Sequence, residues 1–177
     1  MSGGKGFTLL ELAVVMAIVA ILLVAATPPM QRLLLDARRT RVINELVRAL
    51  HAARAESIRS SSDVVVCPSD TGEQCSEAGD SWRQGWLVFV NTDRDEPPVR
   101  DIDERLVLRY GTDRTGTVSA NRNSFVYRPF GRRSTNGTLI YCDRRGPSAA
   151  RAVIVSHTGR PRIARESPSG APLVCPE

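Results

Sequence analysis

The sequence GFTLLELAVVMAIVAILLVAATPP, residues 6–29, decides how the rest of the chain is organised. From Phe7 to Ala26 it runs for twenty residues with one charge, Glu11, and no glycine or proline. A helix rises about 1.5 Å per residue, so this run spans roughly 30 Å, the thickness of the hydrocarbon core of a bilayer. The stretch therefore predicts a membrane-spanning helix.

The residues around this span differ from those of a secretory signal peptide. Such a peptide has a basic start, an apolar run of about 7 to 15 residues and a small-residue cleavage site after it. Here Lys5 and Gly6 come before the apolar run, so any cut is expected ahead of the helix. A carboxylate such as Glu11 is costly in hydrocarbon unless it is paired. The amine freed by a cut after Gly6 on a neighbouring subunit would be a suitable partner.

Gly6 and the residues FTLLE after it resemble the class III leader junction of type IV pilins and of the pseudopilins of type II secretion. The resemblance implies that a prepilin peptidase cuts after Gly6 and methylates the new amino group of Phe7. It also implies that Glu11 serves assembly with other pilin subunits in a filament. Pro28 falls where the family usually has a helix-kinking proline, and the additional Pro29 predicts a sharper break. The alternative is a single-pass anchor on an unrelated periplasmic domain.

Beyond the membrane helix, about 150 residues remain, enough for one domain with its own core. We predict a leader peptide at residues 1–6, a transmembrane helix at 7–27, an amphipathic helix at 28–62 and a globular β domain at 63–177. The predicted location is the bacterial inner membrane, with the β domain in the periplasm, and then the cell-surface pilus.

All four cysteines, Cys67, Cys75, Cys142 and Cys175, lie in the exported part, where an oxidising compartment lets them pair. Four cysteines allow three pairings. We favour Cys67 with Cys75, which closes a short loop, and Cys142 with Cys175, which ties down the C-terminal tail. A metal site is the alternative, but the spacing is not C-x-x-C and the chain has only two histidines, so no metal is expected.

The hydrophobic period changes from helical to strand-like near residue 63. Before it, apolar residues recur at steps of three and four: Val42, Ile43, Leu46, Val47, Leu50 and Ala53. After it, short β-branched or aromatic runs alternate with turn residues, at 64–67, 85–90, 106–110, 124–128, 138–142, 152–156 and 162–164. No helical pattern alternates with these strands, which argues against a parallel sheet. The predicted fold is α+β, a long N-terminal helix packed on an antiparallel β domain.

Three motifs in the β domain resemble the GspH/FimT family of minor pilins. They are WRQGWLVF at residues 82–89, NG at 136–137 before a strand, and RAVIVS at 151–156 followed by GR at 159–160. With the leader junction they cover nearly the whole chain. The resemblance implies a β-sandwich-like head of two sheets beside the helix, and a place among the minor subunits that prime or cap a filament.

Charge is divided unevenly within the β domain. Residues 69–104 hold ten acidic residues and three arginines, a net charge of minus seven, whereas residues 121–165 hold ten arginines and one acid, a net charge of plus nine. A basic block this dense in a chain of net charge +5 indicates a polyanionic partner. The alternative is the codon bias of a GC-rich genome, because every basic side chain after Lys5 is an arginine.

The stretch GRPR at residues 159–162 is the leading candidate for this contact. Gly159 permits a tight turn, and the proline restricts the backbone between Arg160 and Arg162. Their guanidiniums are forked donors suited to phosphate oxygens. The stretch resembles one in FimT members linked to DNA capture in natural transformation, which implies that Gly159, Arg160 and Arg162 contact double-stranded DNA. The alternative is an ordinary hairpin turn with solvated arginines. Weaker candidates, if folding brings their loops to the same side, are Arg132, Arg133, Arg144, Arg145 and Arg165.

The sequence lacks the common catalytic motifs: it has no G-x-S-x-G, no H-E-x-x-H and no nucleotide-binding glycine loop. Ser156 and His157 are adjacent on a predicted strand and would point to opposite faces. We predict a minor type IV pilin that binds DNA non-specifically for uptake, with no enzymatic activity, cofactor or small-molecule substrate. The alternatives are a GspH-like pseudopilin of type II secretion, a minor pilin that only primes assembly, and an anchored periplasmic enzyme.

Overall fold

The computed structural model describes residues 6, 8–76, 81–111, 116–129 and 133–176. The chain comprises two compact units, Met1–Ala37 and Arg38–Glu177, and we call the second unit the head. Helix α1, Leu9–Ser60, has residues in both units. It is long and apolar enough to cross a membrane.

α1 continues through Pro28 and Pro29 without ending. The sharper break predicted from the second proline is therefore not found. A proline removes its own hydrogen bond to the carbonyl four residues earlier, at a cost of about 3 kcal/mol. The leucine-rich and alanine-rich runs on both sides favour helix strongly, and they carry the helix across the pair.

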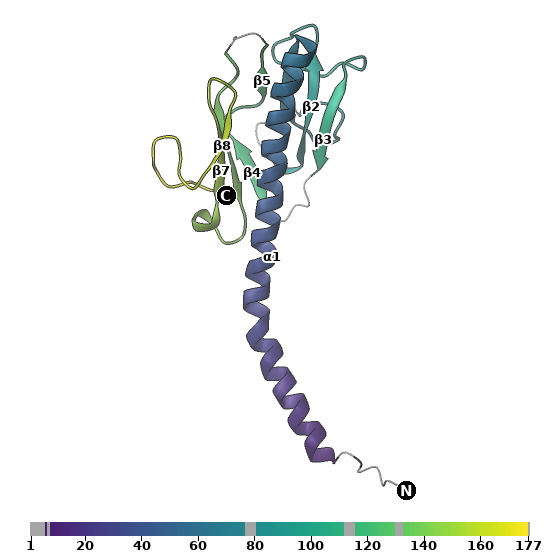
Figure 1. Ribbon diagram of the computed structural model, residues 1–177, viewed down its shortest axis with the longest axis vertical. Helices are drawn as coiled ribbons and strands as arrows, with labels where there is room; N and C mark the ends of the chain where they lie inside the picture. The colour runs from purple at the N-terminus through teal and green to yellow at the C-terminus, as the bar shows by residue number, and fades with distance from the viewer. Residues whose placement is uncertain (1–5, 7, 77–80, 112–115, 130–132, 177) are drawn as a thin grey trace. The chain divides into compact units, whose positions relative to one another are not determined.

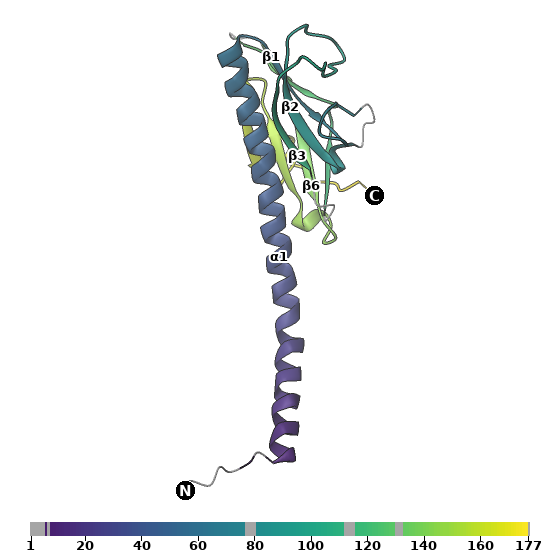
Figure 2. The ribbon, with the colours of Figure 1, turned by 90° about the vertical axis from the view of Figure 1, so that its right-hand side faces the viewer.

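Two four-stranded antiparallel sheets make up the rest of the head (Figures 1 and 2). Sheet A has the strand order β3-β2-β1-β5 and comprises β1 (Asp63–Pro68), β2 (Gly85–Asn91), β3 (Leu106–Gly111) and β5 (Phe125–Tyr127). Sheet B has the order β4-β6-β7-β8 and comprises β4 (Thr117–Ala120), β6 (Gly137–Cys142), β7 (Arg151–Val155) and β8 (Pro161–Ala164). Two short 3-10 helices, η1 (Ser81–Arg83) and η2 (Pro147–Ala149), lie in the connections. The α+β prediction is confirmed.

The main core of the head joins α1 to the inner faces of both sheets, which lie on the same side of the helix (Figure 2). The helix contributes a stripe of buried residues: Val42, Ile43, Leu46, Ala49, Leu50 and Ala53. The stripe follows the predicted period, except that Val47 is only partly buried. The three buried clusters and both disulfides lie within residues 42–175. The head therefore contains what it needs to fold without the N-terminal unit.

The outer face of sheet A is also buried. Leu87 and Phe89 pack there in a second cluster with Cys67, which is bonded to Cys75. Since both faces of the sheet are covered, β2 is buried at every position. This explains why its sequence is a continuous apolar run and does not alternate.

The outer face of sheet B is covered by the C-terminal tail. Leu173 packs against Ile154, and the Cys142–Cys175 disulfide fixes the tail to β6. The two bridges are the pairs favoured from the sequence, with Cα separations of 5.6 and 5.9 Å. Each outer face is thus closed by a segment that a disulfide holds.

One strand, β4, was not predicted from the sequence. It has only four residues, of which Val118 alone is buried, and it pairs with β6. A strand this short carries too little alternation to be recognised without its partner. The other seven strands agree with the predicted bounds to within one residue.

Candidate nucleic-acid interface

The GRPR stretch forms the turn of the β7–β8 hairpin and the first part of β8. The Gly159 backbone N–H donates to the Ser156 carbonyl at 2.8 Å, and the Ser156 backbone N–H donates to the Arg160 carbonyl at 3.1 Å. The Ser156 hydroxyl also accepts from the Arg160 backbone N–H at 3.2 Å. Gly159 has φ +73°, a conformation that favours glycine. The turn is therefore closed by its own hydrogen bonds.

A second requirement fixes glycine at this position. A Cβ placed on Gly159 would lie 2.7 Å from Cε1 of Tyr127 and 3.2 Å from the Ser134 hydroxyl oxygen. Tyr127 is 1% exposed, so its ring has no room to retreat. The Gly159 backbone therefore packs directly on the Tyr127 ring of β5. This contact places the turn, and with it Arg160, against sheet A.

One of the weaker candidates for a DNA contact, Arg133, also lies beside the hairpin. The Ser134 backbone N–H donates to the His157 carbonyl at 3.3 Å, so residues 133–136 lie beside the turn. Arg133 precedes this hydrogen bond directly and is exposed. The fold therefore places Arg133 near Arg160, although 27 residues separate them in sequence.

Arg162 lies in the edge strand β8, and Arg160 lies in the turn directly before that strand; both side chains are exposed. Within the described part of the chain, neither guanidinium has a hydrogen-bond or ion-pair partner. They differ in this respect from arginines such as Arg128 and Arg145, which bind carboxylates of the head.

A hollow of about 420 Å³ lies along β8 and the segment that follows it. Arg162 and Arg165 both line it, together with one carboxylate, Glu166, and with Ser167, Pro168 and Gly170 of the segment after β8. Arg165 also has no side-chain partner among the described residues. The hollow therefore brings two available guanidiniums to one concave surface, a suitable place for an anionic group.

Two further candidates lie elsewhere. Arg144 and Arg145 belong to the β6–β7 connection, whereas the GRPR turn joins β7 to β8 at the other end of β7. Five strand residues separate the two ends, about 14 Å at about 3.4 Å per residue. Folding thus separates these arginines from Arg160. Arg132 lies outside the described residues.

Arg145 already has a structural partner. Its Nη2 lies 2.7 Å from Oδ2 of Asp143, a carboxylate whose side chain is 0% exposed. Burial alone would raise the pKa of Asp143, but hydrogen bonds from Arg145 and the charges of Arg145 and Arg39 outweigh it and hold that pKa below its usual value. Arg145 is therefore a poor candidate for a DNA contact.

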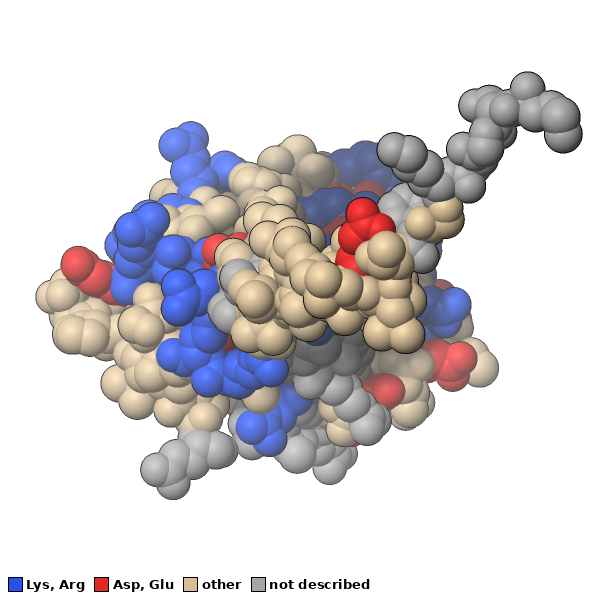
Figure 3. All heavy atoms as spheres, turned by 90° about the horizontal axis from the view of Figure 1, so that it is seen from below, with Lys and Arg blue, Asp and Glu red and all other residues tan. Residues whose placement is uncertain are grey.

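The acidic and basic segments of the sequence also lie in different parts of the folded head. The acidic residues gather in the loop between β2 and β3 of sheet A, and the available arginines belong to sheet B and its connections. Figure 3 shows basic side chains crowded over part of the face that it views, with few carboxylates among them. A surface of one sign attracts a polyanion before contact.

The N-terminal site residues show a feature that sequence reasoning missed. Thr8 Oγ1 accepts from the Glu11 backbone N–H at 3.2 Å, and Glu11 Oε2 accepts from the Thr8 backbone N–H at 2.9 Å. This reciprocal pair is a capping box, which the spacing T-x-x-E already signals. Glu11 thus has a partner within its own chain at the start of α1. Gly6 is exposed, and Phe7 lies outside the described residues.

The residues that were considered for catalysis belong to the β7–β8 turn, and Ser156 helps to close it with hydrogen bonds. Ser156 and His157 are both exposed, and the Ser156 hydroxyl is 2.9 Å from that of Thr158. Among the described residues, no three His, Cys, Asp or Glu side chains are grouped closely enough to hold a metal ion.

Two models of known protein families match this chain. A model described as "Type II transport protein GspH" matches residues 42–159, about two thirds of the chain, and the "Prokaryotic N-terminal methylation motif" matches residues 1–27. The chain belongs to the GspH family. It is accordingly a pilin-like subunit, a minor type IV pilin or a GspH-like pseudopilin, and the family is structural.

Solved structures with the same fold include two crystal forms of the type IV minor pilin FimU of Pseudomonas aeruginosa strain PAO1. The P65 form has a TM-score of 0.52 at 18% identity and covers 75% of this chain and 95% of that chain. The P21 form has a TM-score of 0.53 at 19% identity and covers 84% and 99%. No curated protein sequence matches significantly. The likeness confirms the predicted type IV pilin fold.

Proposed function

We propose that this chain is a minor type IV pilin whose head holds double-stranded DNA on the arginines of the β7–β8 hairpin. The observation that carries the proposal is the set of guanidiniums without partners in the described chain, on one turn and one hollow: Arg133, Arg160, Arg162 and Arg165. Other arginines of the same sheet are used within the fold. Available, exposed arginines grouped on one surface are the groups that phosphates need.

The mode of binding follows from the side chains nearby. Tyr127 and Tyr141 lie close in sequence to the basic residues, but both are 1% exposed and belong to the core. They offer no face for stacking bases. Binding would therefore depend on backbone phosphates, would show little base preference and would weaken steeply with salt.

Assembly would precede this role. A prepilin peptidase would cut after Gly6 and methylate Phe7 while α1 anchors the chain in the inner membrane with the head in the periplasm. Glu11 would then exchange its capping contact with Thr8 for the new amine of a neighbouring subunit, because that pair neutralises a carboxylate within an apolar filament core. Uptake of DNA in natural transformation would follow from a pilus that carries this head.

The test is a fluorescence anisotropy titration of residues 30–177 with a random-sequence duplex at 50 and 200 mM salt. We expect the unmodified head to lose about a hundredfold in affinity between the two concentrations, if about four phosphates are neutralised. The Arg160→Ala/Arg162→Ala variant should bind more weakly, and its salt slope should be smaller by about two.

The matched control is Arg48→Ala/Arg109→Ala, which removes the same charge from exposed arginines of α1 and β3. Equal loss in the control and the hairpin variant would show that only net charge matters. No binding at 50 mM salt would reject the DNA function and leave a structural subunit.

A pseudopilin of type II secretion is the second candidate, because the family model that matches is described as a type II transport protein. Its head would contact other pseudopilins and no DNA. Loss of protein secretion without loss of pili in a strain lacking this chain would support it. Loss of pili with intact secretion would support the minor pilin.

A further inference from the structure

The head carries a second basic surface at the end where α1 leaves it. Arg39 Nη1 donates to the Ala149 carbonyl at 2.9 Å, and this hydrogen bond holds the β6–β7 connection beside the first turn of α1 in the head. We call residues 38–41 and 143–151 together the exit face. With the neighbouring Asp36 included, it holds six arginines and two acids, a net charge of plus four. Figure 3 views the head from this end.

Most of this charge is not neutralised within the head. Arg39 and Arg151 donate to backbone carbonyls, which carry no net charge, so both keep their positive charge. Arg38 and Arg41 are exposed, and among the described residues neither guanidinium has a hydrogen-bond or ion-pair partner. They are three residues apart, so they are neighbours on the helix surface. The exit face therefore presents guanidiniums that can donate to phosphate oxygens.

The apolar span of α1 brings the exit face close to a membrane. α1 is helical without interruption from the span to the head, and Arg38 comes eleven residues after Thr27, the last residue of the predicted transmembrane helix. Eleven residues are about 17 Å at about 1.5 Å per residue. The polar region of one leaflet takes up about 5–7 Å of this distance. Whatever the angle between the two units, Arg38 is thus about 10 Å or less from the headgroups, close to the Debye length at 0.1 M salt.

The other end of sheet A carries the opposite charge. Residues 93–104, in the loop between β2 and β3, hold six acids and two arginines, a net charge of minus four. An ion pair between Arg105 and Glu56 places this acidic loop near the C-terminal end of α1. Glu56 follows Arg39 by seventeen residues, about 25 Å along the helix. The acidic loop and the exit face therefore lie toward opposite ends of the head.

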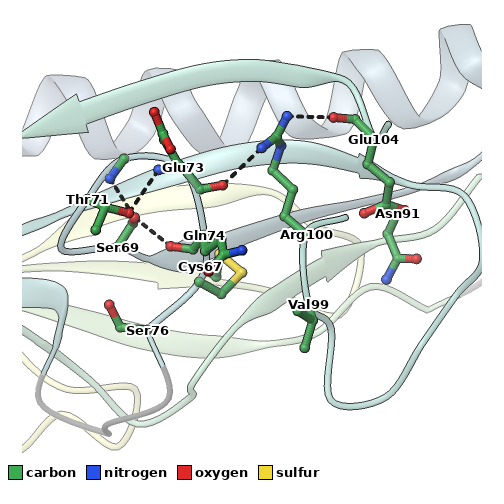
Figure 4. The surroundings of a disulfide bond; sticks show 12 residues. Cys67, Ser69, Thr71, Glu73, Gln74, Ser76, Asn91, Val99, Arg100 and Glu104 are labelled. Carbon is green, nitrogen blue, oxygen red and sulfur yellow. Dashed lines mark hydrogen bonds between the residues drawn. A yellow bond between two sulfur atoms is a disulfide. The ribbon is translucent and has the colours of Figure 1, made fainter. Parts of the chain in front are cut away.

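Hydrogen bonds fix the acidic loop in this position (Figure 4). The Arg100 guanidinium donates to the Glu104 carbonyl at 2.8 Å and to the Glu73 carbonyl at 3.0 Å. Glu104 is buried, and its carboxylate accepts from the backbone N–H of Thr92 at 2.6 Å and of Asp101 at 3.2 Å. A negatively charged surface repels this loop and attracts the exit face.

We propose that the exit face binds the phosphate groups of anionic phospholipids at the surface of the membrane that α1 spans. This inference rests on the membrane anchoring of the chain and does not need DNA binding. The contact holds the head against the bilayer before assembly, with the acidic loop at the end away from the lipid. Entry into a filament then requires these phosphate contacts to be broken.

The test is cosedimentation of residues 30–177 with vesicles of phosphatidylcholine, either pure or with about 30% phosphatidylglycerol. The head is suitable because its core and disulfides lie within residues 42–175. We expect binding to the anionic vesicles only, and weaker binding as salt is added. Arg38→Gln/Arg41→Gln should lower the partition coefficient about 25-fold, since each arginine near an anionic surface contributes about fivefold. Glutamine has nearly the helix propensity of arginine, so α1 should keep its structure.

The matched control is Arg160→Gln/Arg162→Gln, which removes the same charge beyond the other end of β7. Vesicle binding should change little in this variant. Equal binding to both kinds of vesicle, or an equal loss in both variants, would overturn the proposal. So would a loss of duplex binding in place of vesicle binding on substitution of Arg38 and Arg41, because the exit face would then be a nucleic-acid surface. The DNA proposal fails separately, since this variant keeps every arginine of the hairpin.

A second measurement uses the full chain in lipid nanodiscs. Trp82 and Trp86, the two tryptophans of the chain, are both buried in the core of the head. The decay of their fluorescence anisotropy therefore follows the rotation of the head. Nanodiscs that contain phosphatidylglycerol should slow this rotation, and Arg38→Gln/Arg41→Gln should restore the rate found in phosphatidylcholine. Equal rotation in the two lipids would show that the headgroups do not hold the head.

Discussion

At the residue scale, the turn before Arg160 requires glycine at position 159. Gly159 combines a positive φ with a Cβ position that the Tyr127 ring occupies. Glycine is required here for two separate reasons, conformation and space. The consequences of a methyl group should therefore exceed those of a simple turn glycine.

We expect Gly159→Ala to lower the free energy of unfolding of the head by about 2–3 kcal/mol, the sum of a strained φ and an overpacked contact. The hairpin would shift and DNA affinity would fall with it. Urea denaturation and the anisotropy titration measure the two effects. The control is Gly72→Ala, because Gly72 also has φ +77° but its Cβ position would meet only the flexible Arg109 side chain, at an ordinary contact distance of 3.5 Å. Equal losses in both variants would show that the Tyr127 contact does not matter.

A second residue-scale prediction concerns Asp143, whose pKa in the folded head is lowered. A carboxyl with a lowered folded pKa contributes stability above its unfolded pKa of about 3.9, and that contribution is lost as the pH falls through the folded value. Arg145→Gln should therefore destabilise the head by about 2 kcal/mol at pH 7 and by much less at pH 3. Urea denaturation at both pH values tests this. The same loss at both would mean that the pair does not control the titration.

At the element scale, two disulfides hold two covering segments, and their loops differ in length. Cys142 and Cys175 are 33 residues apart, whereas Cys67 and Cys75 are 8 apart. The longer bridge restricts the unfolded chain more strongly. It also fixes the tail that follows the residues lining the hollow after β8, the last of which is Gly170.

Replacing Cys142 and Cys175 by serine should cost about 4 kcal/mol of unfolding free energy, against about 2.5 kcal/mol for Cys67 and Cys75, on the chain-entropy estimate. Only the first change should weaken DNA binding, because only that bridge tethers the hollow. Urea denaturation and the anisotropy titration decide it. A larger effect of the shorter bridge on either measurement would contradict this assignment.

At the scale of the whole molecule, charge separates into an acidic loop on sheet A and available arginines on sheet B. Opposite charges on one head attract different partners to different surfaces. The acidic side repels a polyanion, and this favours an approach with sheet B facing the nucleic acid. Orientation is thus set before any specific contact forms.

The salt dependence of DNA binding measures how many phosphates this surface contacts. With four arginines engaged, log K should fall against log salt with a slope of about −3 to −4. Arg144→Ala should leave the slope nearly unchanged, because Arg144 already has an interaction partner within the described part of the chain. A slope steeper than about −6 would show that arginines outside the hairpin also bind.

Local sequence patterns were sufficient to predict most of the helices, strands and disulfides of this protein. The apolar span, the stripe on α1 and the β-branched runs are periodic patterns, and seven of eight strands followed from them to within one residue. The cysteine pairing also matched, because a short loop and a tail closure are favoured by the spacing alone. The exceptions were β4, too short to show a period, and Pro29, where the surrounding helix formers prevailed.

The arrangement of the candidate site was decided by the tertiary structure. The sequence by itself determined a membrane-length helix, an antiparallel β domain and a basic block, because each depends on neighbours in the chain. Which arginines are available depended on distant partners: Arg145 is bound by Asp143, Arg133 comes beside the hairpin through Ser134, and Arg165 shares a hollow with Arg162. Such pairings join side chains across strands and connections, and no periodicity along the chain records them.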